Sequence, residues 1–254
     1  MNMLQDQIVI YTCVTGGFDE LKPVPDNFHI RCILFTDNPN HKINGWESIL
    51  IDTKDQSAIE ANRVIKIKFH SEILKYQYSI YIDGNVTIDT NALFFINELI
   101  GSGSDMSLNK HPRFGSVYED LFEIFRVGIV DGNKMISVMK ECINLGISSN
   151  DSFYECNIIF RKHSSKILNF ADDWWEFFKK GTGRDQAAFL MSVKKNNFNI
   201  LDMRMGDIRS NSGKFFSIEN HSTKKFFWLR FLKRILSEIK LTRFRFFLLL
   251  RKTN

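Results

Sequence analysis

Short apolar runs alternate with longer stretches of helical periodicity along most of this chain. Apolar runs rich in β-branched and aromatic residues predict strands at 7–15, 31–37, 46–52, 78–82 and 154–161. Stretches with an apolar side chain every three or four residues predict helices at 57–75, 116–126, 131–144, 164–180 and 185–194. Because alternating strands and helices form right-handed crossovers, we expect a single α/β domain with a mostly parallel central sheet.

Near the end of the chain, a second segment shows helical hydrophobic periodicity and is rich in Lys and Arg. Apolar side chains at 228, 231, 232, 235 and 239 fall on one helical face, and Lys or Arg side chains at 230, 233, 234 and 240 fall on the other. Such a helix is typical of proteins that lie on an anionic membrane surface, and docking on its own domain is the alternative. We therefore expect a domain at 1–223 and a basic amphipathic tail at 224–254 that contacts a membrane.

The net charge of the chain, +5, is unevenly distributed. Residues 224–254 contain ten Lys or Arg and one acid, a net charge of +9, which leaves −4 for residues 1–223. This distribution favours a neutral-to-acidic domain with a basic tail, and it disfavours a nucleic-acid-binding domain.

Composition and cysteine spacing are those of an ordinary globular protein. The 254 residues are 44% hydrophobic and 25% charged, which suits one full α/β domain. The four cysteines, at 13, 32, 142 and 156, form no CxxC pair, so they predict neither a disulfide framework nor a zinc site. Residues 1–7 are polar, and no stretch reaches the ~18 apolar residues of a spanning helix, so we expect a cytoplasmic location.

The apolar run at 80–82 ends in Asp83-Gly84-Asn85, which brings a carboxylate to the end of a strand. In open α/β sheets ligands bind outside the carboxyl ends of the strands, and an Asp there can hold a divalent cation that also binds a diphosphate. The alternative is a plain turn, because Asp, Gly and Asn all favour turns.

Two more strands end in residues suited to a ligand. The first is followed by Thr15-Gly16-Gly17, where the glycines let the backbone approach a phosphate or nucleoside, and the second ends in Asp37. Neither the G-x-G-x-x-G nor the G-x-x-x-x-G-K-[ST] pattern is present, so a tight turn is the alternative.

The helix predicted at 57–75 carries Arg63, Lys66 and His70 along one face, since they are spaced by three and four residues. This face suggests a cation pair that meets the phosphates of a nucleotide. The alternative is a solvated basic face, which is how most charge runs are used.

Four other positions are candidates for a site. Glu155 and Asn157 fall on one face of the strand at 154–161. Polar side chains at the start of an otherwise apolar strand suggest a functional role. Asp185 begins a helix, where capping is the alternative, and Trp174 offers a sugar platform or, alternatively, a core side chain. His221, in a polar loop, is a candidate metal ligand.

Taken in order, several short motifs resemble one family. They are 11–19 (YTCVTGGFD), 35–37 (FTD), 66–70 (KIKFH), 78–85 (YSIYIDGN), 111–113 (HPR), 118–119 (YE), 155–161 (ECNIIFR) and 184–186 (RDQ). Together they resemble the glycosyltransferase-like family first catalogued as a domain of unknown function, from bacterial polysaccharide clusters and plant polysaccharide synthesis. The resemblance runs from about residue 8 to about residue 200.

The resemblance implies a GT-A type, Rossmann-like domain that binds a nucleotide-sugar, for which a UDP-sugar is expected. Asp83-Gly84-Asn85 stands where related enzymes carry Asp-x-Asp, with Asn85 in place of the second acid. The implied donor-binding residues are Thr15, Gly16, Gly17, Asp37, Arg63, Lys66, His70, Asp83, Gly84, Asn85 and Arg184. The implied catalytic residues are Asp185, Gln186, Glu155 and Asn157. The expected ligands of Mn²⁺ or Mg²⁺ are Asp83, Asn85 and His221, and the expected acceptor-binding residues are His111, Arg113, Tyr118, Glu119 and Trp174.

These residues predict a glycosyltransferase that is peripheral on the inner face of the plasma membrane. It would transfer a sugar to a surface polysaccharide, such as capsule or lipopolysaccharide, or to a lipid-linked oligosaccharide, and retention of configuration is slightly favoured. One alternative is a non-catalytic carbohydrate- or nucleotide-binding module. Another is a nucleotidyl- or phosphotransferase on a similar sheet.

Overall fold

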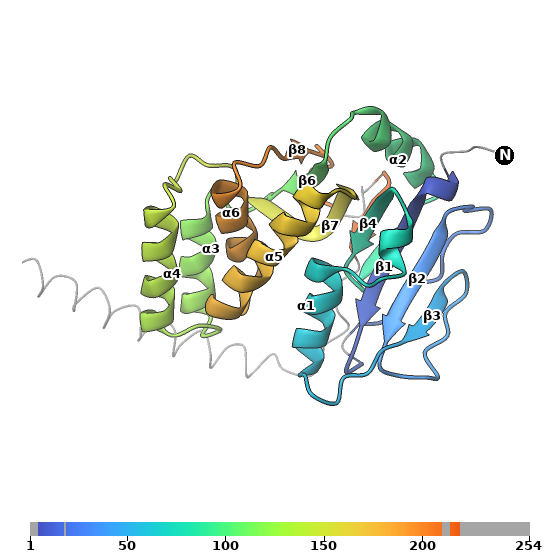
Figure 1. The fold of residues 1–254 in the computed structure, drawn as a ribbon, viewed down its shortest axis with the longest axis horizontal. Coiled ribbons are helices and arrows are strands. Elements are labelled where there is room, and N and C mark those ends of the chain that lie inside the picture. The colour runs from blue at the N-terminus through green and yellow to red at the C-terminus, as the bar shows by residue number, and fades with distance from the viewer. Residues whose placement is uncertain (1–4, 18, 210–213, 219–254) are drawn as a thin grey trace, which may run out of the picture.

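The computed structural model describes residues 5–17, 19–209 and 214–218 (Figure 1). Its central sheet has the strand order β3-β2-β1-β4-β7-β6-β8. The strands of this sheet are β1 (Ile8–Val14), β2 (Arg31–Thr36), β3 (Glu47–Leu50), β4 (Tyr78–Ile82), β6 (Met106–Lys110), β7 (Tyr154–Lys162) and β8 (Leu201–Asp202). β3, β2, β1 and β4 are parallel, whereas β7 runs antiparallel to β4 and β6. The prediction of an α/β fold with a mostly parallel sheet is confirmed.

The helices and a small second sheet surround this central sheet. The helices are α1 (Ala58–Lys68), α2 (Ala92–Gly101), α3 (Val117–Arg126), α4 (Gly132–Asn144), α5 (Ser165–Lys180) and α6 (Asp185–Lys195). The small sheet pairs β5 (Val86–Ile88) with β9 (Phe216–Ile218) in antiparallel fashion. Short 3₁₀ turns lie at Gln5–Gln7 and Ile73–Lys75.

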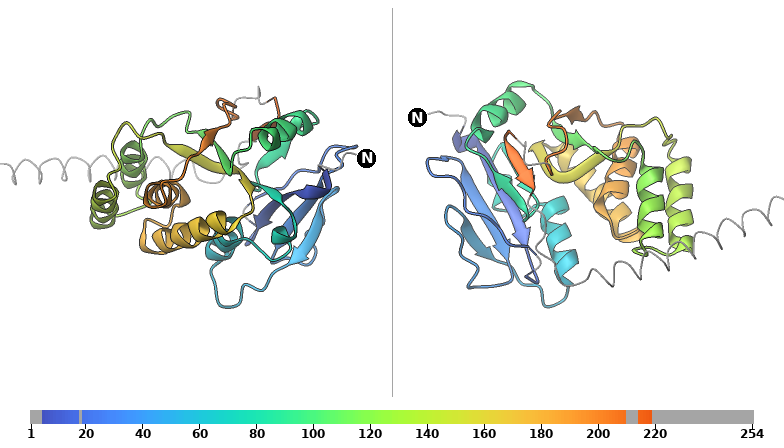
Figure 2. Two further views of the ribbon diagram at one scale, coloured as in Figure 1. Left: turned by 45° about the horizontal axis from the view of Figure 1, so that its top comes forward. Right: turned by 180° about the vertical axis from the view of Figure 1, so that it is seen from behind.

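The elements form layers on both faces of the central sheet (Figures 1 and 2). α1, α5 and α6 pack on one face, and α2 packs on the other together with β5 and β9. α3 and α4 lie beyond α6 and share a separate apolar cluster with it. β1 shows why the sequences of these strands are continuously apolar. Val9 and Tyr11 face the first layer while Ile8 and Ile10 face the second, so every position is buried.

α1 begins where the sequence predicts and ends earlier. Ser57 caps the helix, and its hydroxyl accepts a hydrogen bond from the backbone N–H of Glu60 at 3.1 Å. The helix ends at Lys68 because Phe69 adopts φ = +66°, a left-handed conformation that an α-helix does not contain. The predicted helix at 57–75 was therefore too long, and His70 lies outside it.

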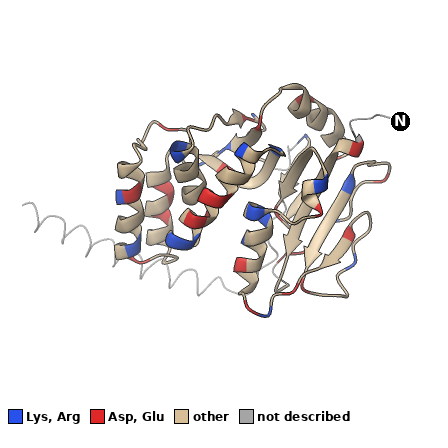
Figure 3. Cartoon of the chain, in the orientation of Figure 1, with Lys and Arg blue, Asp and Glu red and all other residues tan. Residues whose placement is uncertain are grey.

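Charges of both signs are mixed over the described elements, as Figure 3 shows for this face of the molecule. No helix in the described part of the chain is long and apolar enough to cross a membrane. The predicted basic tail at 224–254 lies outside the described residues.

Candidate functional site

A cavity of about 460 Å³ lies at the carboxyl end of β4, between α1, β7 and the first turn of α6. Most of its lining side chains are polar or charged. The lining residues are Arg63, Lys66, Asp83, Asn85, Ile129, Glu155, Cys156, Asn157, Arg184, Asp185, Gln186, Arg209 and Ile218. The fold therefore gathers, at one place, predicted site residues that are more than a hundred positions apart in the sequence.

Lys66 is the buried centre of one wall of the cavity. Its side chain is only 1% exposed, and its Nζ lies 2.5 Å from Asp185 Oδ2 and 3.1 Å from Asp83 Oδ1. Arg63, one turn earlier on α1, places its Nε 3.5 Å from the same Asp185 oxygen. Tyr81 Oη donates a further hydrogen bond of 3.0 Å to Asp83 Oδ1. The two carboxylates compensate the buried cation, as buried charges require.

Asp185 stays ionised although it is buried. Burial by itself raises the pKa of this carboxyl, but the charges of Lys66 and Arg63 outweigh burial and hold the pKa well below its usual value. The position of Asp185 is fixed from behind, because Trp174 Nε1 donates a 2.9 Å hydrogen bond to its backbone carbonyl oxygen. A fixed, ionised carboxylate thus faces the cavity beside two cations.

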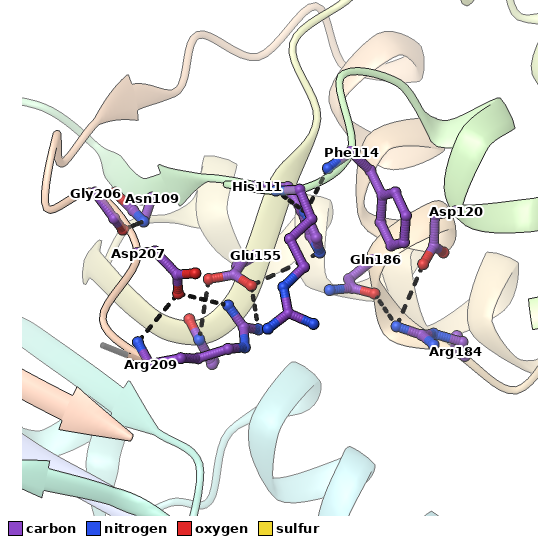
Figure 4. Close-up of polar contacts among 12 residues, drawn as sticks. Asn109, His111, Phe114, Asp120, Glu155, Arg184, Gln186, Gly206, Asp207 and Arg209 are labelled. Atoms are coloured by element: carbon purple, nitrogen blue, oxygen red, sulfur yellow. Dashed lines mark hydrogen bonds and ion pairs between the residues drawn. The ribbon is translucent and has the colours of Figure 1, made fainter. Parts of the chain in front are cut away.

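A second charged cluster surrounds Glu155, whose side chain is 1% exposed (Figure 4). Arg209 Nη2 donates to Glu155 Oε1, and Asn157 Nδ2 donates to Oε2 at 3.3 Å. His111 Nε2 lies 3.7 Å from Oε1. Asp207 accepts a 3.3 Å hydrogen bond from the other terminal nitrogen of Arg209. Arg209 and Asn157 thus donate to the two oxygens of Glu155, and the His111 imidazole lies beside one of them.

Arg184 lies beside the N-terminus of α6 and reaches back to α3 (Figure 4). Its Nη2 donates to Gln186 Oε1 at 2.5 Å and lies 3.4 Å from Asp120 Oδ1. Asp120 has no exposed surface, and burial raises its pKa even though the charge of Arg184 lowers it. Asp120 thus fixes the direction of a cavity-lining cation without lining the cavity itself.

The turn after β1 meets the ends of β2 and β4, as expected of neighbouring parallel strands. The backbone N–H of Gly16 donates to the Asp37 carboxylate at 3.0 Å, and Thr15 Oγ1 donates to the carbonyl oxygen of Ala58 at 2.6 Å. A Cβ on Gly84 would lie 2.7 Å from Val14 Cγ2, so only glycine fits this close approach. Gly17 has φ = +65° and is exposed. None of these residues is among those that line the cavity.

Several predicted acceptor and donor residues do not line the cavity. His70 packs against the Phe35 ring, at 4.8 Å between ring centroids. The Tyr118 hydroxyl donates to the carbonyl oxygen of Ile147 at 2.7 Å, and Glu119 accepts from the backbone N–H of Gly115 at 2.9 Å. Arg113 is exposed.

Trp174 is a core side chain, as the alternative interpretation of the sequence had it, and not a platform for a sugar. Trp174 has no exposed surface and packs against Phe170 and Phe189, at 6.1 Å and 5.0 Å between ring centroids. A ring without exposed surface offers no face on which a sugar can stack.

Comparison with known families agrees with the resemblance seen in the sequence. The family model TOD1/MUCI70, glycosyltransferase-like domain, matches residues 33–210. The chain belongs to this family. No curated protein matches the chain. The TOD1/MUCI70 match spans every lining residue of the cavity except Ile218, so the cavity belongs to the glycosyltransferase-like domain.

Two charged residues at the site of this TOD1/MUCI70 domain, Arg209 and Asp120, were missed from the sequence. Arg209 lies in an irregular segment after β8, without a recognisable motif around it. Asp120 follows Glu119, which the sequence analysis named as an acceptor-binding residue. On a helix these neighbours point in directions about 100° apart, and only packing decides which one faces Arg184.

The predicted metal ligands are only partly described. Asp83 and Asn85 line the cavity, and His221 lies outside the described residues. Within 5–17, 19–209 and 214–218, no three His, Cys, Asp or Glu side chains converge as a metal site. Asp83 and Asn85 offer oxygen ligands, which suit Mg²⁺ or Mn²⁺ when substrate phosphates complete the shell.

Proposed function

We propose that this chain is a glycosyltransferase that moves a sugar from a nucleotide-diphosphate sugar, a UDP-sugar by expectation, to an acceptor hydroxyl. The acceptor proposed is a surface polysaccharide or a lipid-linked oligosaccharide. Membership of a glycosyltransferase-like family supports this proposal, as does a charged cavity at the carboxyl end of a parallel strand. We further propose that the domain is of the GT-A type.

The observation that carries the proposal is Lys66, buried between Asp83 and Asp185 at the cavity wall. When the bond from the anomeric carbon to the β-phosphate oxygen breaks, the electron pair leaves with the diphosphate. Lys66, Arg63 and Arg184 are fixed cations in the cavity, and fixed cations stabilise such growing negative charge most strongly where water is excluded.

Asp185 suits the stabilisation of positive charge better than proton transfer. A carboxylate whose pKa is held below its usual value is a weak proton acceptor, whereas it still stabilises the oxocarbenium-like sugar of the transition state. The acceptor oxygen would then bond to the anomeric carbon, and its proton would pass to the leaving diphosphate. This division of roles favours retention of configuration, with Gln186, Glu155 and Asn157 orienting the sugars.

A divalent cation is part of the proposal. Asp83 and Asn85 would hold Mn²⁺ or Mg²⁺ together with the diphosphate oxygens, and His221 would be a further ligand. The ion would supply additional positive charge to the leaving group. Lys66 already lies 3.1 Å from Asp83 Oδ1, so the protein contributes one cation of its own at this place.

The cellular site is also proposed. The basic amphipathic tail at 224–254 would hold the enzyme on the anionic inner face of the plasma membrane, near lipid-linked acceptors. The enzyme itself would be cytoplasmic and peripheral.

A panel of nucleotide sugars, with Mn²⁺ present or chelated, tests the proposal. We expect one donor to release its nucleoside diphosphate, and Asp83→Ala to lower that turnover at least a hundredfold. Asp105→Ala is the matched control, because Asp105 pairs with Lys166 and does not line the cavity. Full activity of Asp83→Ala would contradict the site. Donor binding without turnover would identify a binding module, and release of pyrophosphate or nucleoside monophosphate would identify a nucleotidyl- or phosphotransferase.

A further inference from the structure

One wall of the cavity is built by β7 and by the segment after β8. Glu155 and Asn157 lie on β7, and Arg209 reaches Glu155 from the later segment. The Arg209 side chain is 28% exposed and lines the cavity with both of them. A ligand in the cavity can therefore contact the Glu155 carboxylate together with the amide and the guanidinium that donate to it.

The hydrogen bonds around His111 fix its tautomer. Its Nδ1 accepts from the backbone N–H groups of Arg113 and Phe114, at 3.2 Å and 3.0 Å, so the proton lies on Nε2, toward Glu155 (Figure 4). Burial, together with the charges of Arg209, Arg184 and Arg113, lowers the pKa of His111 to about 4. At neutral pH this imidazole therefore adds a donor to the cluster and no charge.

The charges of this wall are balanced. Glu155 and Asp207 are the acids, and Arg209 pairs with both, while Arg113 acts electrostatically on Asp207. An anionic ligand group would be placed beside the carboxylate of Glu155, which is buried and cannot be screened by water. The wall thus suits an uncharged ligand.

Asn157 supplies an independent indication of a ligand. It is only 8% exposed, and its Oδ1 has no hydrogen-bond partner in the described part of the chain, since its Nδ2 is the atom that donates to Glu155. Glu155 and Asn157 offer acceptors, and Arg209 offers donors. A sugar hydroxyl both donates and accepts, so neighbouring hydroxyls match this set.

We propose that Glu155, Asn157 and Arg209 form a subsite for an uncharged sugar of the acceptor, bound through neighbouring hydroxyl groups. The subsite rests on the proposed function and makes Arg209 its specificity-determining residue. Sugars that carry a carboxylate, such as hexuronic acids, are excluded from it.

Ligand-observed NMR with methyl glycosides, in the presence of UDP, tests this subsite. We expect at least one neutral methyl hexoside to bind at least tenfold more tightly than the matching methyl hexuronide. Arg209→Met should weaken that binding at least tenfold, and Arg209→Lys, which keeps the charge but not the forked geometry, should weaken it less. Arg204→Met is the matched control, because Arg204 is an exposed residue of the same segment that does not line the cavity.

Three results would overturn the subsite: hexuronides bind as tightly as hexosides, Arg209→Met binds hexosides as the unsubstituted chain does, or none of these sugars binds. Circular dichroism and UDP affinity confirm that each variant is folded. If hexosides bind through Arg209 while no nucleotide sugar is turned over, the proposed transferase activity fails and the subsite stands.

Discussion

Lys66 Nζ lies 2.5 Å from Asp185 Oδ2, and this ion pair joins α1 to the first residue of α6 inside the cavity wall. Both side chains are at least 90% buried. Because both charges are buried, the loss of Lys66 removes the nearer counter-charge of Asp185 and leaves Arg63, whose Nε lies 3.5 Å from the same oxygen.

Lys66→Met should therefore destabilise the fold by roughly 3–5 kcal/mol, the usual cost of breaking a buried ion pair. Urea denaturation followed by circular dichroism measures this change. The double variant Lys66→Met with Asp185→Asn should recover part of the loss, because the buried side chain at position 185 is then neutral as well. Lys68→Met is the control, since the Lys68 side chain is 36% exposed and its ion pair within the described part of the chain is with Asp172, away from the cavity. Equal stability of Lys66→Met and Lys68→Met would show that the pair contributes nothing.

Stability should fall as the pH decreases from about 6.5 to about 4, because two histidines are buried in the neutral form. Burial is the main cause that lowers the pKa of His111 and of His163 from 6.5 to about 4. Between these values the unfolded chain binds protons that the folded chain does not. The free energy of unfolding therefore decreases as the pH is lowered. Each histidine contributes at most about 1.4 kcal/mol per pH unit.

Urea denaturation at several pH values between 7 and 4 measures this slope. His111→Gln removes one titrating group and should reduce the slope. An unchanged slope would show that the pKa of His111 is the same in the folded and the unfolded chain.

Asp120→Asn should raise stability and weaken donor binding. Burial raises the pKa of Asp120, so its ionised form destabilises the fold at neutral pH and ceases to do so as the carboxyl is protonated. The amide should hold Arg184 less firmly, and we expect UDP affinity to fall about tenfold, or about 1.4 kcal/mol.

Thermal unfolding and calorimetry with UDP measure the two effects of Asp120→Asn. Glu119→Gln is the control, because Glu119 is the exposed neighbour of Asp120 on α3. If Glu119→Gln weakened UDP binding as much as Asp120→Asn, the contact between Asp120 and Arg184 would not be the cause.

Trp174→Phe should destabilise the domain without changing the affinity of the folded protein for a sugar acceptor. The substitution removes the hydrogen bond to the Asp185 carbonyl oxygen and leaves space in a closely packed core. Urea denaturation measures the first effect, and acceptor KM at a temperature where the variant is folded measures the second. A tenfold rise in acceptor KM with unchanged stability would restore the sugar-platform interpretation.

Removal of residues 224–254 should release the protein from vesicles of anionic phospholipid and leave its activity on soluble acceptors unchanged. Each Lys or Arg near such a surface contributes about 1 kcal/mol to binding. Co-sedimentation with anionic and with neutral vesicles measures the effect. If the shortened chain failed to fold, the tail would belong to the domain.

The sequence alone determined the α/β architecture, because strands buried on both faces must be continuously apolar and helices with one buried face must show their own period. It also determined that Asp83 lies at the end of a strand and that Asp185 begins a helix. These are local properties, fixed by turn and capping chemistry within a few residues.

Only the tertiary structure decided which of these side chains meet. That Lys66 lies between Asp83 and Asp185 depends on how α1 and α6 pack against the sheet, and the period of α1 alone cannot show it. The helical period left Asp120 and Glu119 indistinguishable, and packing buried Asp120 against Arg184. Arg209 joins Glu155 from 54 positions away, through a segment with no regular period to read. Contacts between distant segments depend on tertiary packing, and a local sequence pattern does not predict them.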